Sequence, residues 1–443
     1  MLFDFPPENW QVSTLGEICQ EGGGDIQTGP FGSQLHASDY VFSGIPSIMP
    51  ANIKEGRVSE EGIARITEAD AKRLSKYLTK AGDIVYSRRG DVERCALIRK
   101  REEGWLCGTG CLRVRPGSGI VDPEFCSHFL SHPETKEWIS RHAVGATMPN
   151  LNTQILSALP VLLPSLPEQK AIAHILGTLD DKIELNRKTN ETLEAMAKAL
   201  FKSWFVDFDP VRAKAEGRPT GLPADISDLF PDSLEDSELG EIPRGWEVKA
   251  LDEIAHFLNG LALQKFPPED GAATLPVIKI AQLKKGDSTG ADRCSTAVPS
   301  DYVVRDGDML FSWSGSLAVD IWCGGDGALN QHLFKVTSKT YGKWFFYQWV
   351  NHHLPGFQEI AQGKATTMGH IQRHHLSEAK VLIPPPSLLA AMDSAFTTLL
   401  DRSFGLRRQS IDLASVRDAL LPKLISGEIR IPDAEKMLEE VGI

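Results

Sequence analysis

Three arginines lie close together in the stretch Ser87-Arg-Arg-Gly-Asp-Val-Glu-Arg94. The stretch follows an apolar run typical of a β-strand, so the arginines are expected on a loop at a strand end. A guanidinium group binds the edge of guanine or a phosphate through paired hydrogen bonds. Arg88 and Arg89 are therefore the strongest candidates for contact with a nucleic acid, whereas Arg94 has acidic neighbours as alternative partners.

Other side chains of the kind that read bases lie in turn-like segments, since Asn and Gln suit adenine and Arg and Lys suit guanine. In the first third of the chain the further candidates are Ser33, Gln34, Asn52, Lys54, Thr147, Asn150 and Asn152. After residue 243 they are Gln264, Lys265, Lys279, Gln282, Ser312, Trp313, Ser314, Ser316, Asn330, Gln331, His332, Thr366, His370 and Arg373. For each of them a solvated side chain or a satisfied turn is the alternative interpretation. Phosphate contacts should outnumber base contacts.

Motifs for catalysis are incomplete. Gly363-Lys-Ala-Thr366 lacks the upstream glycine and the Lys-Ser/Thr pair of a phosphate-binding loop. His370 and His374 are spaced for a metal on a helix, but no acidic or Cys ligand is evident nearby, which favours a polar loop. Pro432-Asp-Ala-Glu-Lys436 mimics a nuclease motif in a short acidic tail. The sequence also lacks an Asn/Asp-Pro-Pro-Tyr/Phe motif and a glycine-rich methyl-donor loop, so we expect no methylation by this chain alone.

A long helix is predicted from Pro167 to Phe208, because this stretch is rich in Ala, Leu, Glu and Lys and contains a single glycine. Alternating steps of four and three residues produce the seam of a coiled coil. The seam residues are Ile172, Leu176, Leu179, Ile183, Asn186, Asn190, Leu193, Ala197, Leu200 and Trp204. Two adjacent Asn layers can fix the register of a partner helix. An isolated helix of this kind would be unstable in water, so a second helix is expected.

The second helix belongs to an internal repeat. Trp10-(x4)-Leu-Gly-Glu-Ile18 returns 236 residues later, Gly82-Asp-Ile-Val-Tyr-Ser87 returns 225 later, and Val161-Leu-Leu-Pro164 returns 220 later. The offset then stays at 220 through a helix predicted over about 387–426. Its pairing residues are Leu399, Leu406, Leu413 and Leu420. Two equal helices, each preceded by a globular copy, can lie antiparallel about a pseudo-two-fold axis and act as a ruler between two binding heads.

Composition narrows the class of protein. A chain of 443 residues suits two or three domains, and no apolar run approaches the ~20 residues of a membrane span. The start MLFDFPPENW lacks the pattern of a signal peptide, and seven scattered cysteines fit reduced thiols. We therefore expect a cytoplasmic protein without a membrane partner. Residues 206–245 and 431–443 hold nine of the twelve excess negative charges, so the rest of the chain can carry a basic face.

The expected fold is α/β (α+β), with two mostly β domains containing short helices and two long antiparallel helices that form a coiled coil. The expected segments are a first β-rich domain at 1–165, a first long helix at 166–208, an acidic linker at 209–242, a second β-rich domain at 243–385, a second long helix at 386–430 and an acidic tail at 431–443.

Nearly the whole chain resembles the specificity subunit of type I restriction–modification systems, the HsdS family. The matching phrases are Thr28-Gly-Pro-Phe-Gly-Ser33, Gly82-Asp-Ile-Val-Tyr-Ser-Arg-Arg-Gly90, Pro149-Asn-Leu-Asn152, Val161-Leu-Leu-Pro-Ser-Leu-Pro-Glu-Gln169 and Phe201-Lys-Ser-Trp-Phe-Val-Asp-Phe208. The second copy departs from them, because Gly260-Leu-Ala-Leu replaces Gly-Pro-Phe-Gly and Pro384-Pro-Pro-Ser-Leu-Leu lacks the Pro-Glu-Gln phrase.

The resemblance implies that each β-rich domain is a target recognition domain for one half of a bipartite, asymmetric site on double-stranded DNA. The helices would space the domains and dock two methyltransferase subunits, which motor-nuclease subunits would join. The chain itself would be non-catalytic and would bind neither metal nor cofactor. Its partners would use S-adenosylmethionine, ATP and Mg2+.

The sequence is also compatible with three other functions. The first is the same role in a modification-only or other phage-defence methyltransferase complex. The second is a metal-dependent nuclease, which would show a chelator-sensitive activity. The third is a scaffold whose helices organise partners without reading DNA.

Overall fold

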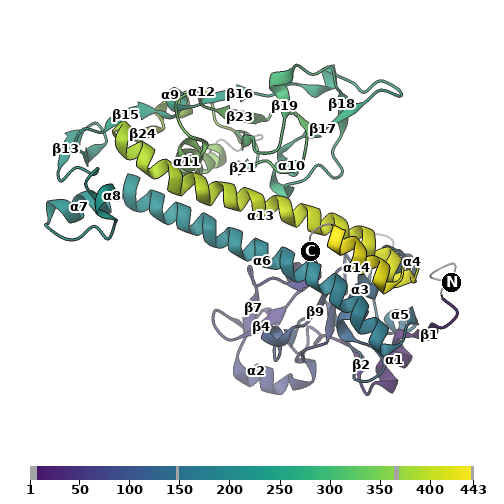
Figure 1. The fold of residues 1–443 in the computed structure, drawn as a ribbon. Coiled ribbons are helices and arrows are strands. Elements are labelled where there is room, and N and C mark those ends of the chain that lie inside the picture. The colour runs from purple at the N-terminus through teal and green to yellow at the C-terminus, as the bar shows by residue number, and fades with distance from the viewer. Residues whose placement is uncertain (1–6, 146–148, 364–368, 441–443) are drawn as a thin grey trace. The chain divides into compact units, whose positions relative to one another are not determined.

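The computed structural model describes residues 7–145, 149–363 and 369–440. The chain divides into two compact units (Figure 1). Unit 1 comprises Met1–Ile183 with Asp412–Ile443, and unit 2 comprises Glu184–Ile411. Both long helices cross this division, so each unit contains one β-rich head and a portion of each helix. We refer to residues 7–165 as head 1 and to residues 243–385 as head 2.

Head 1 is built from short strands, as its clusters of apolar residues bounded by Gly, Pro, Asn and Ser predict. One four-stranded sheet has the order β2-β11-β8-β9, and a second has the order β10-β4-β7-β3. Two-stranded sheets join β1 with β12 and β5 with β6. The strands are β1 Gln11–Thr14, β2 Asp25–Thr28, β3 Tyr40–Val41, β4 Ile45–Ile48, β5 Ile53–Lys54, β6 Arg57–Val58, β7 Ala64–Ile66, β8 Ile84–Ser87, β9 Cys95–Leu97, β10 Leu106–Cys107, β11 Cys111–Arg115 and β12 Pro160–Leu163.

Head 2 repeats this plan. Its sheet β16-β23-β20-β21 corresponds to β2-β11-β8-β9, and its pair β15-β24 corresponds to β1-β12. Its other sheet is β18-β17-β22-β19, and the hairpin β13-β14 precedes head 2 in the chain. The strands of this hairpin and of head 2 are β13 Leu234–Ser237, β14 Gly240–Pro243, β15 Glu247–Ala250, β16 His256–Asn259, β17 Thr274–Ile278, β18 Arg293–Ser295, β19 Val303–Val304, β20 Met309–Ser312, β21 Val319–Ile321, β22 Gly327–Leu329, β23 Leu333–Thr337 and β24 Lys380–Ile383. The expected duplication of a mostly β fold is confirmed.

Each unit also contains further helices besides the two long ones. In unit 1 they are α1 Leu15–Glu21, α2 Glu68–Arg73, α3 Pro123–Ser131, α4 Pro133–His142, α5 Thr153–Ser157 and α14 Ile431–Glu440. In unit 2 they are α7 Asp209–Ala215, α8 Ala224–Ser227, α9 Leu251–Ile254, α10 Ile280–Lys285, α11 Lys343–Gly363 and α12 Arg373–Glu378. The aromatic run Trp344–Trp349 lies in α11 and contributes four buried rings to the core, as expected for a core helix.

The long helices are α6, Leu166–Phe205, and α13, Pro386–Ser426. They run antiparallel within each unit, as expected. In unit 1, Arg417 of α13 pairs with Asp180 of α6 at 2.8 Å. In unit 2, Asn186 Nδ2 donates to Gln409 Oε1 at 3.0 Å, so one of the polar layers spans the two helices. Helix α6 ends three residues before the expected Phe208, which adopts a left-handed conformation and turns the chain.

Two segments that composition marked as acidic carry structure of their own. The expected linker, 209–242, contains α7, α8 and most of the hairpin β13–β14. Val211 and Phe230 within it are buried in the core of unit 2, so the segment does more than lie over the surface. The expected tail forms α14, and Ala434 buries its methyl group in the core of unit 1. In both segments a few apolar residues among many acids suffice to anchor the backbone.

None of the described helices is long and apolar enough to cross a membrane. All seven cysteines are free and buried, in agreement with the expected reduced thiols.

Candidate nucleic-acid interface

The loop after β8 is fastened to the segment that begins at Pro149. Leu151 N–H donates to Arg88 O at 2.9 Å, and Gly90 N–H donates to Pro149 O at 3.1 Å. Arg88 N–H in turn donates to Gly110 O at 2.8 Å. These three bonds fix the backbone on both sides of Arg88. We call this place the head 1 junction.

Head 2 contains the same junction. Ile371 N–H donates to Trp313 O at 3.0 Å, Gly315 N–H to Gly369 O at 2.7 Å, and Trp313 N–H to His332 O at 3.3 Å. The isolated bridge Arg89–Asn150 of head 1 corresponds to the bridge Ser314–His370 of head 2. The two heads therefore place different side chains on one backbone frame.

The head 1 junction holds two guanidinium groups that no carboxylate neutralises. Within the described residues, Arg88 and Arg89 are the arginines of head 1 without an ion pair. The other nine, Arg57, Arg65, Arg73, Arg94, Arg99, Arg101, Arg113, Arg115 and Arg141, each pair with Asp or Glu. Arg88 is half-buried, with its guanidinium carbon 5.9 Å from the centre of the Phe31 ring, whereas Arg89 is exposed.

Two buried polar atoms of this junction also lack hydrogen-bond partners in the described part of the chain. They are Arg88 Nε and Asn150 Oδ1. Such atoms are rare in folded proteins, because an unpaired buried donor or acceptor costs free energy. Positive charge, an exposed aromatic ring and unused polar atoms thus lie together at one strand end, which suits binding to bases and phosphates.

The head 2 junction is closed by its own hydrogen bonds. Trp313 Nε1 donates to Asn259 Oδ1 at 2.9 Å, and Ser314 Oγ lies 2.9 Å from His332 Nδ1. Gln331 and His370 are half-buried beside them. Arg373 is exposed, with its guanidinium 5.8 Å from the Phe334 ring. This junction offers single hydrogen-bonding groups and aromatic faces.

Several expected contact residues have structural roles within the fold. Asn52 is 3% exposed, and its amide binds the backbone of Met49, Ser59 and Glu61. Asn152 caps α5. The remaining residues of this kind have their side chains in turns or in the interior: Gln34, Gln282, Ser312 and Asn330. Residue spacing does not distinguish a structural turn residue from a contact residue, because turns and contact loops use the same polar residues.

The other candidates lie at the surface. Ser33, Gln264 and Lys265 are exposed. Lys54 pairs with Glu61, Lys279 with Asp292, and Arg94 with Asp91, while Ser316 accepts a hydrogen bond from Lys284. Thr147 and Thr366 lie outside the described residues.

Sequence reasoning missed Phe31 and Asn259, which support the side chains at Arg88 and Trp313. An aromatic residue between glycines in Gly-Pro-Phe-Gly was the available signal for Phe31, since a loop has no core in which to bury it.

One group of possible metal ligands does not fit a metal. Among the described residues, His374, His375 and Glu378 bring ligand atoms within 4.8 Å of one another. The Nδ1 atom of His375 accepts the Gln372 N–H at 2.9 Å. A neutral imidazole then carries its proton on Nε2, which leaves no lone pair for a metal. His370 lies outside this helix, in the head 2 junction.

Residues 7–195 and 243–388, more than half of the chain, match a family described as "Type I restriction modification DNA specificity domain". The chain belongs to this specificity family. The type I restriction enzyme MjaIX specificity subunit of Methanocaldococcus jannaschii is 26% identical over 440 residues, which cover 96% of this chain and 95% of the relative. The HindI specificity subunit of Haemophilus influenzae is 26% identical over 475 residues, covering 95% of this chain and all of the relative.

A solved member of the specificity family has the same fold. The S subunit of a type I restriction–modification system from M. genitalium aligns with a TM-score of 0.57 and 16% identity, over 96% of this chain and 98% of that one. The resemblance drawn from the sequence phrases is thus confirmed at the level of the family and of the fold.

The twelve residues expected to pair the long helices are Ile172, Leu176, Leu179, Ile183, Asn186, Asn190, Leu193, Leu200, Leu399, Leu406, Leu413 and Leu420. All twelve are buried or half-buried. Beside this seam, α6 and α13 contact α3 in unit 1 and α11 in unit 2. We call the surface where α3 meets the long helices of unit 1 the α3 face. We call the surface where α11 meets the long helices of unit 2 the α11 face.

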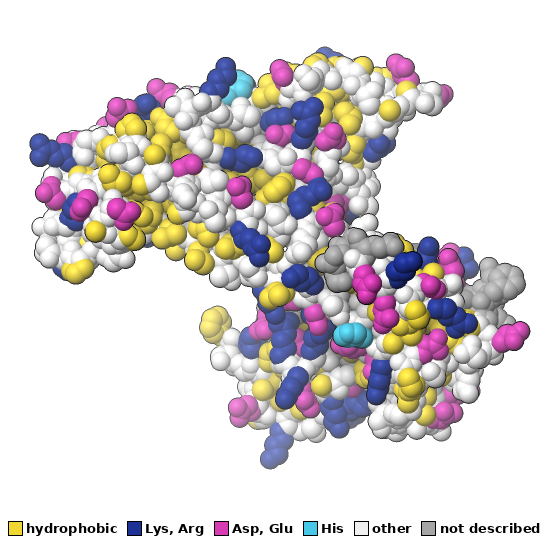
Figure 2. Space-filling model, in the orientation of Figure 1, with side chains coloured by type: hydrophobic (Ala, Val, Ile, Leu, Met, Phe, Trp, Pro, Cys, Tyr) yellow, Lys and Arg dark blue, Asp and Glu magenta, His cyan; other side chains and the backbone are white. Residues whose placement is uncertain are grey.

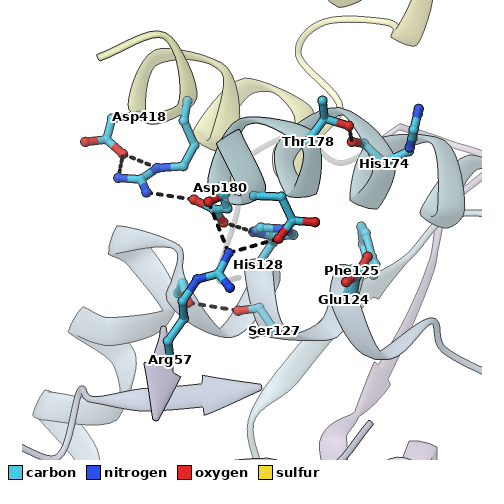
Figure 3. Close-up of polar contacts among 12 residues, drawn as sticks. Arg57, Glu124, Phe125, Ser127, His128, His174, Thr178, Asp180 and Asp418 are labelled. Carbon is cyan, nitrogen blue, oxygen red and sulfur yellow. Dashed lines mark hydrogen bonds and ion pairs between the residues drawn. The ribbon is translucent and has the colours of Figure 1, made fainter. Parts of the chain in front are cut away.

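The α3 face of this specificity-family chain is charged (Figure 3). Asp180 on α6 pairs with Arg417 of α13 at 2.8 Å and lies 4.0 Å from His128 Nδ1. Arg57 donates to Asp180 O and pairs with Asp181, each at 3.0 Å. Burial lowers the pKa of His128, although Asp180 opposes this. The histidine thus lies within a network of ions that includes Asp180, Arg417 and Arg57.

The α11 face is mainly apolar, although Lys198, Lys202 and Arg407 also line it. Figure 2 shows hydrophobic side chains gathered over α6, α11 and α13 of unit 2. Here the three helices form a groove of about 480 Å³. Its apolar lining includes Leu193, Ala197, Phe201, Phe396, Leu400 and Phe404. Burial raises the pKa of Glu194 at its edge.

Proposed function

We propose that this chain is the non-catalytic DNA-reading subunit of a type I restriction–modification complex. In this proposal, head 1 and head 2 each read one half of a split, asymmetric site on double-stranded DNA. The observation that carries it is the pair Arg88 and Arg89. Nine of eleven arginines in head 1 are neutralised within the described structure, and the two that are not lie side by side at a strand end.

The repeat supports two readers rather than one. Both junctions use equivalent backbone bonds, so whatever contacts DNA in head 1 has a counterpart in head 2. Because the side chains differ, the two half-sites should differ in sequence. The net charge of −12 does not oppose this, since most of the excess acid lies outside the two heads.

The α11 face supports a docking site for a helix of a methyltransferase subunit. On α6 the lining residues Leu193, Ala197 and Phe201 are four apart, and a ridge of this kind can pack against a further helix. Two methyltransferase subunits would bind the chain, and motor-nuclease subunits would join the complex through them. S-adenosylmethionine, ATP and Mg2+ would act in those partners, in the cytoplasm.

The DNA-reading role is tested by co-expressing the chain with its neighbouring methyltransferase gene and mapping modified adenines across the genome. A split motif that disappears when this chain is deleted is expected. Arg88→Ala with Arg89→Ala should abolish it. Arg94→Ala is the matched control, because Arg94 is already paired with Asp91. Methylation that persists without the chain would overturn the proposal.

The docking role is tested by Leu400→Asp in the groove, with Leu185→Asp as the matched control. Leu185 is a leucine of α6 that is 57% exposed outside the groove. Co-purification of the methyltransferase subunit should fall with the first variant and stay unchanged with the second. Circular dichroism of both variants checks that the long helices are intact. If both variants co-purify equally well with the methyltransferase subunit, the groove is not its docking site.

A further inference from the structure

Arg88 and Arg89 differ in how firmly the fold holds them. This difference suits one arginine to reading a base and the other to binding a phosphate. Reading a base requires a side chain whose aim is fixed, because bidentate bonds to guanine tolerate little error. Binding a phosphate requires charge and reach more than aim. The head 1 junction contains one arginine suited to each task.

Arg88 is held from three directions. Its N–H donates to Gly110 O at 2.8 Å, and its carbonyl accepts from Leu151 N–H at 2.9 Å. Its guanidinium lies over the Phe31 ring, and its Nε is buried. Only the two terminal nitrogens are then free to face a ligand, and they form the end-on fork that matches guanine O6 and N7.

Arg89 has the opposite character. Its side chain is exposed, and no ion pair or ring contact restrains it in the described structure. It is the neighbour of Asn150 in the bridge between the two segments, so its backbone is fixed while its guanidinium is exposed to solvent. A free cation at the rim of a binding site follows the phosphate backbone.

The position of Arg88 is taken by Trp313 in head 2. Its indole Nε1 is committed to Asn259 Oδ1 at 2.9 Å, and an indole has no acceptor and no second donor. The equivalent site in head 2 therefore lacks a group that can read guanine in this way.

We infer that Arg88 is a specificity-determining residue that reads a guanine in the half-site of head 1, with Phe31 as the residue that positions it and Arg89 as a phosphate contact. This inference rests on the proposed function. It goes beyond the proposed function by naming guanine as one base of the site and by assigning that base to head 1.

The experiment is a methylome map of the chain with its methyltransferase, comparing Arg88→Lys with Arg89→Lys. Lysine keeps the charge but loses the fork. Arg88→Lys should relax one guanine position in one half of the motif, by roughly 5- to 150-fold in preference, which is the discrimination of one bidentate pair. Arg89→Lys should leave every position as strict as before.

Phe31→Ala is the second variant. It leaves Arg88 in place but removes the ring beneath it, so it should relax the same guanine to a smaller extent and no other position. A ring that merely stabilises the head would lower methylation evenly over the motif. Selection of sites from a randomised DNA library by the purified complex gives the same readout if a variant methylates too weakly for mapping.

The outcomes separate the inference from the proposed function. A split motif that depends on the chain, but stays equally strict with Arg88→Lys or relaxes at a base other than guanine, overturns the inference alone. Relaxation by Arg89→Lys in place of Arg88→Lys overturns the assignment of the two tasks. A motif that does not depend on the chain overturns the proposed function itself.

Discussion

The α3 face of unit 1 and the α11 face of unit 2 are built at corresponding places of the repeat, but from different side chains. At positions 220 residues apart, Glu124 corresponds to Trp344, and Asp180 corresponds to Leu400. Arg417 likewise corresponds to Ala197, and His128 to Gln348. Apolar residues pack at both faces, but the α3 face adds the ion pair of Asp180 with Arg417, whereas the α11 face adds stacked aromatic rings.

Two copies of the same backbone fold can therefore be stabilised by different side-chain interactions at equivalent contacts. The aromatic face contains Trp344 stacked on Phe396, with ring centres 4.4 Å apart, and Trp204 in edge contact with the same ring at 5.8 Å. Such packing is insensitive to salt and leaves an apolar groove. The charged face is partly solvated, so its strength depends on ionic strength and pH.

The largest effect is expected when a residue of the charged face is placed in the aromatic one. Trp344→Glu removes a side chain that is 2% exposed and buries a carboxylate without a partner. Loss of the ring and burial of the charge together should cost about 5 kcal/mol or more. Hydrogen exchange of β20 and β23 should show unit 2 opening while unit 1 stays protected.

Glu124→Gln is its control, since this carboxylate is 45% exposed. It should change the free energy of unfolding by less than about 1 kcal/mol. A Trp344→Glu protein with native exchange in unit 2 would contradict the view that aromatic packing holds this face.

A smaller effect is expected when the charged face is made to resemble the apolar one. Asp180→Leu leaves Arg417 without its 2.8 Å partner and should cost about 2 kcal/mol in unit 1. Adding Arg417→Ala, which completes the pattern of Leu400 and Ala197, should restore much of this loss. Denaturant unfolding of both single variants and the double variant measures the coupling. Strictly additive losses would show that the pair does not act as a unit.

A smaller difference between the two faces is expected in their response to salt. Raising NaCl from about 0.05 to 0.5 M shortens the range of charge interactions from roughly 14 to 4 Å. Amide protection of α3 should fall by about 0.5 kcal/mol, whereas protection of α11 should stay constant or rise. Hydrogen exchange at both salt concentrations tests this within one molecule. Equal changes in the two helices would contradict the contrast.

The smallest effect concerns pH. Burial lowers the pKa of His128 in the folded chain below its ordinary value of 6.5, so the unfolded chain binds the proton more readily. His128 therefore favours folding above about pH 6.5, and this contribution is lost as the pH falls toward the lowered pKa. His128→Gln, which introduces the residue found at Gln348, should reduce the loss of unit 1 stability between pH 7 and 5 by a few tenths of a kcal/mol.

Thermal unfolding of both proteins across this pH range measures the difference. His353 of unit 2 serves as an internal reference, because burial lowers its pKa to about 4 in both proteins. Identical pH profiles would mean that His128 does not contribute to the acid sensitivity of unit 1.

The sequence by itself determined the repeat, the two long helices and the family. These features rest on local patterns: a seam of apolar residues three and four apart, and recurring strand phrases at a shrinking offset. It also located the arginine pair, because two guanidinium groups directly after a strand are a feature of the chain itself.

Only the tertiary structure decided which polar residues are available to a partner. Asn52 and Arg88 were both expected in turns or loops, yet one has its amide bound inside the head and the other lacks a carboxylate among the described residues. The same holds for the segment 209–242, whose few apolar residues find a core in unit 2. Long-range contacts determine these outcomes, and a chain pattern records which groups can bond but not which groups the fold brings within reach.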